Sequence, residues 1–170
     1  GRELGLDFSV IARGLYAFRG TGRRFEVLGQ GGGITVVDDY AHHPTEIKAV
    51  LAAAKNLPYQ RVVAVFQPHR YSRTMLFVDE FGNSFANANV VLVNEIYSAF
   101  EKPIEGVSAQ LIVDSVRKHG KEKVYYGEKE ADILQLLETI ARPGDLIMIL
   151  GAGNIRHAGE VFAATVEKLR

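Results

Sequence analysis

Short apolar runs alternate with amphipathic stretches through most of this chain, and the alternation limits the folds open to it. The runs at 62–66, 90–94 and 145–150 are almost continuously apolar, as strands buried on both faces of a sheet must be. Between such runs, apolar residues recur at helical spacing, for example over 44–55 and 131–141. Strands and helices that alternate through short connections form a parallel sheet with right-handed crossovers.

We predict one exception to the parallel order, near the start of the pattern. Two short apolar runs, 25–28 and 34–37, flank the sequence Gly31-Gly32-Gly33, which predicts a hairpin turn. The first strand of a hairpin runs antiparallel to the second. We therefore predict an α/β fold: a three-layer, Rossmann-like domain with a mostly parallel sheet of about six strands and one antiparallel edge strand. The remaining elements are expected as a strand over 123–126 and helices over 74–86, 108–118 (capped by Ser108) and 154–169.

The first twenty residues follow a different pattern. Apolar positions between Leu4 and Phe18 have helical spacing, and Gly20-Thr21-Gly22 then interrupts it as a linker would. The chain opens at Gly1 without an initiating Met. We expect residues 1–20 to be the tail of a preceding domain with its linker, residues 21–170 to form the domain itself, and the whole to be a piece of a longer protein.

Composition excludes several functional classes. The chain has 170 residues, of which 47% are hydrophobic and 24% charged, and Lys+Arg and Asp+Glu both number 20. This balance gives no electrostatic reason to expect nucleic acid or an anionic membrane as a partner. The chain contains no Cys, which excludes disulfides and thiolate metal sites. No apolar run approaches the roughly 20 residues of a membrane span, and we expect a cytoplasmic protein.

A dense set of polar side chains follows the run at 34–37. Asp38-Asp39-Tyr40-Ala41-His42-His43 leads directly into Pro44, a residue that favours the first turn of a helix. Ligands of open parallel sheets bind at the carboxyl ends of strands. Asp39 could hydrogen-bond a ribose hydroxyl or orient a basic group, although Asp is also a common helix N-cap. The rings of Tyr40, His42 and His43 could stack on a base or contact a carboxylate or phosphate.

A second polar set, Gln67 to Thr74, follows the next strand. Arg70 and Arg73 are three residues apart, so at the start of a helix they could face one target and hold a carboxylate, with His69 beside them. Arg is otherwise unusual there, because the helix dipole favours acidic residues. The placement favours an anionic ligand over a solvated first turn.

Three further stretches have more than one interpretation. Arg23-Arg24 fits either a solvated edge strand or a phosphate contact at a domain boundary. Gly151-Ala152-Gly153-Asn154 begins like a dinucleotide fingerprint, but Arg156 occupies the position of the third glycine, which favours a tight turn. The loop over 97–106 could be a lid or a surface excursion. We expect no metal site, since adjacent His side chains diverge and the other ligands are missing.

These motifs together resemble the Mur ligase family. The resemblance is carried by Asp39-Tyr40-Ala41-His42-His43-Pro44-Thr45-Glu46 and by Phe66-Gln67-Pro68-His69-Arg70-Tyr71-Ser72-Arg73-Thr74. Arg23-Arg24-Phe25, Glu95-Ile96-Tyr97-Ser98-Ala99 and Gly151-Ala152-Gly153-Asn154-Ile155 follow the same order as in the family. Five motifs in order, over most of the chain, make the resemblance specific.

The resemblance implies a three-domain, ATP- and Mg²⁺-dependent amide ligase of peptidoglycan synthesis, of which this chain is the carboxy-terminal domain. Residues 1–20 would be the tail of the central ATPase domain, and the upstream domains would hold UDP-N-acetylmuramate and most of the Mg²⁺ contacts. Arg24 would contact ATP phosphates and Asp39 the ribose. The incoming amino acid, L-alanine, would be surrounded by Tyr40, His42, His69, Arg70 and Arg73. The fragment contains no complete catalytic set and is expected to be inactive alone.

Two alternatives remain open at this point. One is the family's recycling ligase, which joins a whole tripeptide to the same sugar nucleotide; the loop from Gln67 to Thr74 favours the alanine-adding type. The other is a free-standing, non-enzymatic module that binds a nucleotide or another anion.

Overall fold

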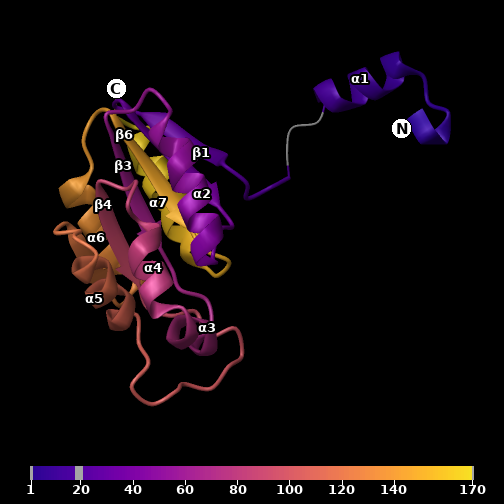
Figure 1. Ribbon diagram of the computed structural model, residues 1–170. Coiled ribbons are helices and arrows are strands. Elements are labelled where there is room, and N and C mark those ends of the chain that lie inside the picture. The colour runs from indigo at the N-terminus through magenta and orange to yellow at the C-terminus, as the bar shows by residue number, and fades with distance from the viewer. Residues whose placement is uncertain (1, 18–20, 170) are drawn as a thin grey trace.

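A six-stranded sheet forms the centre of the protein, seen in a computed structural model that describes residues 2–17 and 21–169 (Figure 1). The strand order is β1-β2-β6-β3-β4-β5. β1 pairs antiparallel with β2, and the remaining neighbours pair parallel. This confirms the predicted fold, including its antiparallel edge strand. The strands are β1 (Glu26–Gly31), β2 (Ile34–Asp39), β3 (Arg61–Phe66), β4 (Val90–Asn94), β5 (Val124–Gly127) and β6 (Asp145–Leu150).

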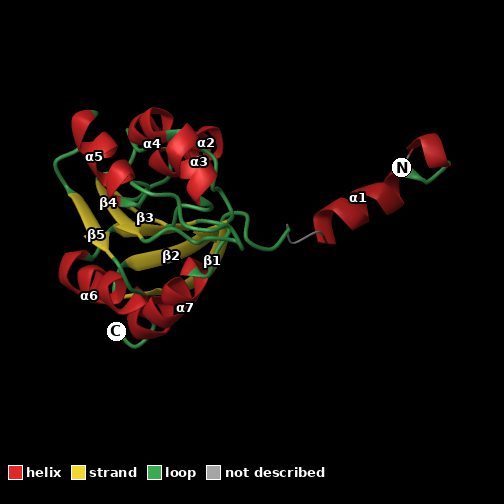
Figure 2. Ribbon diagram, turned by 90° about the horizontal axis from the view of Figure 1, so that it is seen from below, coloured by secondary structure: helices red, strands yellow, loops and turns green. Residues whose placement is uncertain are grey.

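Helices cover both faces of the sheet and complete the three layers (Figure 2). One face carries α2 (Pro44–Lys55), α3 (Tyr71–Leu76), α4 (Val78–Ser84) and α5 (Gln110–Lys118). The other carries α6 (Glu130–Ile140) and α7 (Ile155–Val166). Because helices cover both faces of the sheet, β2, β3, β4 and β6 are buried on both sides. This burial explains why their sequences are almost continuously apolar.

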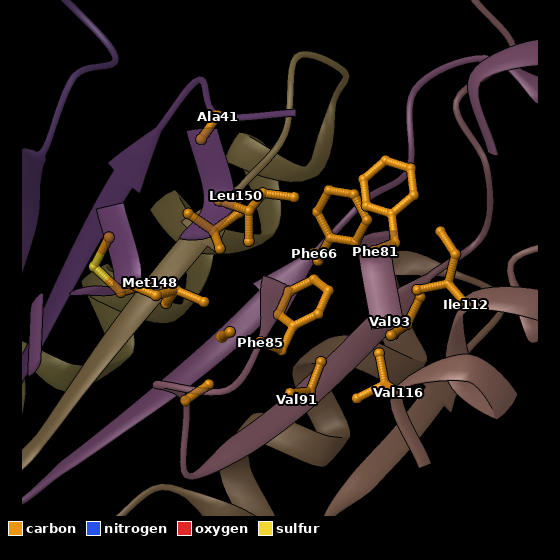
Figure 3. Close-up of a cluster of buried hydrophobic side chains, with 14 of the residues drawn as sticks. Ala41, Phe66, Phe81, Phe85, Val91, Val93, Ile112, Val116, Met148 and Leu150 are labelled. Atoms are coloured by element: carbon orange, nitrogen blue, oxygen red, sulfur yellow. The ribbon is translucent and has the colours of Figure 1, made fainter. Parts of the chain in front are cut away.

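Each face of the sheet has its own apolar core. Beneath α4, the rings of Phe81 and Phe85 each lie 5.4 Å from the ring of Phe66 in β3, measured between centroids (Figure 3). On the opposite face, Leu137 of α6 and Phe162 of α7 belong to a second buried cluster. Burying one such side chain contributes roughly 1.5–3 kcal/mol, so the two clusters fix the sheet between its helical layers.

The predicted hairpin is confirmed at Gly32 and Gly33. Their φ angles are 54° and 76°, the left-handed backbone that a tight hairpin turn with two positive φ values requires. Gly31 is constrained by space instead, because a Cβ atom there would lie 2.2 Å from the carbonyl oxygen of Val166. The turn therefore also seats the end of α7 against β1.

Several predicted helix limits were wrong. The single helix expected over 74–86 is two helices, α3 and α4, separated at Phe77. Ser108 does not cap α5, whose N-cap residue is Ala109 without a side-chain hydrogen bond. The last helix ends at Val166 rather than 169.

The predicted N-terminal helix begins later than expected. A short 3-10 helix, Arg2–Leu4, is followed by Gly5, whose φ is 72°, and α1 then spans Phe8–Ala17. α1 buries none of its residues. The predicted helix end at Phe18 and the predicted linker residue Gly20 lie outside the described residues.

β6 and β3 are neighbours in the sheet, but the helices that follow them lie on opposite faces. The chain leaves β3 for α3 and α4 on one face, and it leaves β6 for α7 on the other (Figures 1 and 2). In open α/β sheets the loops diverge at such a point and leave a crevice at the carboxyl ends of the strands. The polar loops predicted from the sequence surround this edge.

Candidate functional site

The loop after β2 is capped by a histidine and a glutamate. The Nδ1 atom of His43 accepts a hydrogen bond from the backbone N–H of Thr45 at 3.4 Å, and Oε2 of Glu46 accepts from the N–H groups of His42 and His43 at 3.0 and 3.1 Å. Pro44 is the first residue of α2, where its missing N–H costs nothing. Asp38 and Asp39 are therefore not helix caps, and their carboxylates make other contacts.

Asp39 organises the loop and lines a pocket with Arg24. Its Oδ1 atom accepts from the N–H of Ala41 and its Oδ2 atom from the N–H of Phe25, both at 2.9 Å. Arg24 is exposed and lines the same pocket, which has a volume of about 270 Å³. Tyr40 and Glu46 also border this pocket. The structure thus brings together the two residues predicted to contact a nucleotide.

Four aromatic rings from three loops form a continuous array beside this pocket. Ring centroids are 5.2 Å apart for Tyr40 and His42, 5.5 Å for His42 and His69, and 5.6 Å for His69 and Tyr97. His42 is further fixed by its Nδ1 atom, 2.9 Å from the carbonyl oxygen of Tyr40. Tyr97 follows β4 and was not among the predicted site residues. Three of the predicted residues therefore lie together, although β6 separates β2 from β3 in the sheet.

Arg70 and Arg73 contact different partners. Nη1 of Arg73 lies 3.4 Å from Nδ1 of His69, so Arg73 joins the ring array. Arg70 is the N-cap residue of α3 with a φ of 75°, and its Nη1 atom lies 4.0 Å from Oε1 of Glu101. The carboxylate of Glu101 also accepts from the hydroxyl of Ser72 at 2.6 Å. The structure therefore brings Arg73 into the cluster of predicted residues and turns Arg70 toward the loop after β4.

The electrostatics of this cluster favour a neutral His69 among cations. Burial lowers the pKa of His69, and nearby His42, Arg73 and Arg70 lower it further. A neutral imidazole can accept a hydrogen bond from the guanidinium of Arg73. The hydrogen bonds from Ser72 lower the pKa of Glu101, with a smaller contribution from Arg70. The cluster can therefore attract an anion through Arg73.

An ionic network under the site was not predicted. The Asp38 side chain is fully buried, and its Oδ2 atom accepts from Nε of Arg23 at 3.0 Å and from Nη1 of Arg156 at 2.9 Å. Arg156 also binds Glu26, with N–O distances of 2.8 and 3.0 Å. Hydrogen bonding to Arg156 lowers the pKa of Glu26 to about 2. The sequence signal was the arginine at the position of the third fingerprint glycine.

Gln67, directly after β3, connects the end of β4 with the loop after β6. Its Nε2 atom donates to the side-chain oxygens of Asn94 at 3.0 Å and Asn154 at 2.8 Å, and its Oε1 atom accepts from the N–H of Ile155 at 3.2 Å. A Cβ atom on Gly153 would lie 2.2 Å from Gln67 Oε1. Gly153 therefore packs too closely against Gln67 to carry a side chain, in a bend between β6 and α7. A polar pocket of about 420 Å³ opens beside this junction, with Tyr97 in its wall.

The described residues contain neither a cluster of metal-ligating side chains nor a helix that could span a membrane. Within residues 2–17 and 21–169, no group of three or more His, Cys, Asp or Glu side chains is arranged to hold a metal ion. In the same residues, no helix has the length and hydropathy needed to cross a membrane.

Comparison with known proteins gives consistent similarities. The sequence profile of the family described as "Mur ligase, glutamate ligase domain" matches residues 23–153. The UDP-N-acetylmuramate–L-alanine ligase of Pelotomaculum thermopropionicum is 54% identical over 94% of this chain, which spans 34% of that protein.

Two solved structures share the fold. The UDP-N-acetylmuramate–alanine ligase of Thermotoga maritima superimposes with a TM-score of 0.79 at 29% identity, over 96% of this chain and 34% of that one. A murein peptide ligase of Psychrobacter arcticus has a TM-score of 0.71 at 26% identity, over 93% of this chain and 32% of that one. The chain spans about a third of the length of these relatives. Because the profile covers most of the chain and the loops after β2, β3 and β6, the chain belongs to the Mur ligase family.

Proposed function

We propose that the chain is the carboxy-terminal domain of a cytoplasmic, ATP-dependent ligase that joins L-alanine to UDP-N-acetylmuramate in peptidoglycan synthesis. The names of two curated relatives that are 54% and 49% identical to this chain support this activity. Residues 21–170 would form the domain, and residues 1–20 the tail of a central ATPase domain. The chain alone would not catalyse, because the remaining substrate sites would lie in the preceding domains.

Arg24 and Asp39 are proposed as nucleotide contacts. The exposed Arg24 would reach ATP phosphates, where a guanidinium forms strong charge-assisted hydrogen bonds. Asp39 would accept from ribose hydroxyls with the lone pairs that its backbone donors leave free. Their position in one pocket supports this assignment. Within residues 2–17 and 21–169, no group of three or more His, Cys, Asp or Glu side chains is arranged to hold a metal ion, and the ligands of Mg²⁺ would lie mainly in the preceding domains.

The ring array and its two arginines are proposed as the amino-acid site. Arg73 would bind the carboxylate of L-alanine while Tyr40, His42 and His69 enclose the small substrate, with Arg70 at its edge. In the proposed reaction, the muramate carboxylate takes the γ-phosphoryl group of ATP and releases ADP. The amine of L-alanine then displaces phosphate from the acyl phosphate and loses a proton as the amide forms. Negative charge develops in the tetrahedral transition state, so converging donors would stabilise it. One observation carries the proposal. Tyr40 and His42, which follow β2, lie against His69 and Arg73, which follow β3. This cluster lies beside the pocket lined by Arg24 and Asp39.

A pair of variants in the full-length ligase tests this division of roles. Arg73→Ala is expected to raise the KM for L-alanine by roughly tenfold to a hundredfold, the effect of losing a charge-assisted hydrogen bond, with little change in the KM for ATP. Arg24→Ala, at an exposed side chain of the proposed nucleotide pocket, is expected to raise the KM for ATP and to spare that for L-alanine. Arg142→Ala, an exposed arginine preceding β6, is the control. Equal effects of either variant on both substrates would contradict the assignment.

A peptide-adding ligase is the second candidate, supported by the similarity to the murein peptide ligase. The two are separated by the amine donor: we expect turnover with L-alanine and none with a tripeptide that begins with L-alanine. The opposite preference would make the chain part of a recycling enzyme. Absence of turnover with either donor would favour a non-enzymatic anion-binding module.

A further inference from the structure

We propose that Arg23 is a positioning residue for the amino-acid site, because buried contacts hold its guanidinium against the ring of Tyr40. The inference rests on the proposed function and adds a residue that contacts neither proposed substrate. It also gives a role to Arg23, whereas only Arg24 was predicted to contact ATP phosphates.

The backbone at Arg23 is held in an unfavourable conformation. The φ angles of Arg23 and Phe25 are 59° and 49°. These values lie in the left-handed region, which residues other than Gly and Asn seldom adopt. Such backbone persists only where surrounding contacts determine it. Here the Arg23 N–H donates to Glu26 Oε2 at 2.7 Å, and the Arg23 carbonyl accepts from the N–H of Tyr40 at 2.8 Å. Arg23 is thus joined directly to the backbone of a proposed binding residue.

The side chain of Arg23 points inward and is held at two atoms. Its Nε atom donates to Oδ2 of the fully buried Asp38 at 3.0 Å, and its Nη2 atom donates to the carbonyl oxygen of Gly151 at 2.7 Å. Arg156 donates to the same Asp38 oxygen. Charge-assisted hydrogen bonds at a buried carboxylate are strong and directional, so the plane of the guanidinium has little freedom.

This guanidinium contacts the face of Tyr40. The Cζ atom of Arg23 lies 5.0 Å from the ring centroid, within the range of a cation–π interaction. Tyr40 is 43% exposed, and its ring in turn meets that of His42 edge to face. A partly exposed ring needs a rigid neighbour to stay in one orientation, and Arg23 provides it. Loss of Arg23 would therefore disturb Tyr40 and His42 without removing a substrate contact.

The neighbouring Arg24 has the opposite orientation. It is exposed and borders the pocket that contains Asp39. Arg24 is therefore the guanidinium available to a phosphate, whereas Arg23 is committed to Asp38, Gly151 and Tyr40. Lysine could not replace Arg23 fully, since one ammonium group lacks the planar fork that spans these partners.

A double-mutant cycle in the full-length ligase tests the proposal. The variants are Arg23→Ala, Tyr40→Leu and their combination, with Arg142→Ala as the control and thermal unfolding measured for each. Arg23→Ala is expected to raise the KM for L-alanine about tenfold and the KM for ATP less than about twofold. In the Tyr40→Leu background the same change should have less than about a twofold effect on the KM for L-alanine, because contacting residues are coupled.

Other outcomes overturn the proposal. If the double variant raises the KM for L-alanine by the product of the two single effects, Arg23 does not act through Tyr40. Equal rises in the KM for L-alanine and the KM for ATP would show a general structural role. If Arg23→Ala does not fold, Arg23→Lys is measured in its place. Arg23→Lys should raise the KM for L-alanine alone, and an unchanged KM for L-alanine would contradict the proposal. Absence of L-alanine-dependent turnover in the unsubstituted enzyme would instead overturn the proposed function, and this inference with it.

Discussion

Two adjacent carboxylates at the end of β2 have separate environments. Asp38 is fully buried and binds two arginines through Oδ2, while Asp39 is partly exposed and accepts two backbone N–H groups. Asp38 thereby stabilises the base of the site, and Asp39 remains beside the pocket with Arg24. The sequence favoured Asp39 as the ribose contact but could not predict the role of Asp38, because its partners Arg23 and Arg156 lie 15 and 118 residues away along the chain.

Glu26 gives a pH-dependent prediction at this scale. Its contacts with Arg156 lower its pKa from the ordinary value of 4.5 to about 2. Between these values the unfolded chain binds a proton that the folded chain does not, so stability falls as pH decreases through this window. Glu26→Gln should lower the free energy of unfolding at pH 7 and make it less dependent on pH between about 4.5 and 2.

Urea unfolding at several pH values measures this effect, with the exposed Glu105→Gln as the matched control. A Glu26→Gln variant whose stability decreases with acid as steeply as that of the unsubstituted chain would contradict the role of this ion pair.

Single elements were predicted best where local chemistry determines their limits. α2 and β6 have the predicted limits, since Pro44 marks a helix start and residues 145–150 are a continuous strand. The break at Phe77 could not be predicted, because Phe77, Phe81 and Phe85 continue the helical spacing across it. Phe77, at the break, packs against His43 of the loop after β2, with ring centroids 4.9 Å apart.

The loop after β6 gives a prediction at the scale of elements. A Cβ atom on Gly153 would collide with Gln67 Oε1 and would lie 2.7 Å from Cγ of Tyr97. Gly153→Ala should therefore lower the free energy of unfolding by about 1–3 kcal/mol, as overpacking does, and shift the NMR signals of His69, which stacks on Tyr97.

The control for this variant is Gly14→Ala in α1, where a Cβ atom would have no neighbour within 4 Å. If Gly153→Ala leaves both stability and the His69 signals unchanged, the loops after β3 and β6 are not joined as described.

At the scale of the whole molecule, the strand order determines which loops meet. β6 lies between β2 and β3, yet the rings of His42 and His69 are 5.5 Å apart, because the chain leaves β6 toward α7 on the opposite face. The sequence predicted that both loops lie at one edge of the sheet, since parallel strands end together. It could not predict that β6 lies between them, because strand order depends on contacts distant in sequence.

The core beneath α4 gives the prediction for the whole fold. Phe66 is fully buried between Phe81 and Phe85, so Phe66→Ala should lower the free energy of unfolding by about 3–5 kcal/mol. Leu76→Ala, at a side chain that is 70% exposed, should change it by less than about 0.5 kcal/mol. Chemical denaturation of both variants measures the difference, and similar values would contradict the assigned core.

An NMR titration of the isotopically labelled chain, first with L-alanine and then with ATP, tests the central claim most directly. The account predicts that L-alanine shifts the amide signals of residues 40–43 and 69–73, and that ATP shifts those of Arg24 and Asp39. Shifts confined to other parts of the chain, or none for either ligand when the preceding domains are also supplied, would contradict the claim that these loops bind the amino acid and the nucleotide.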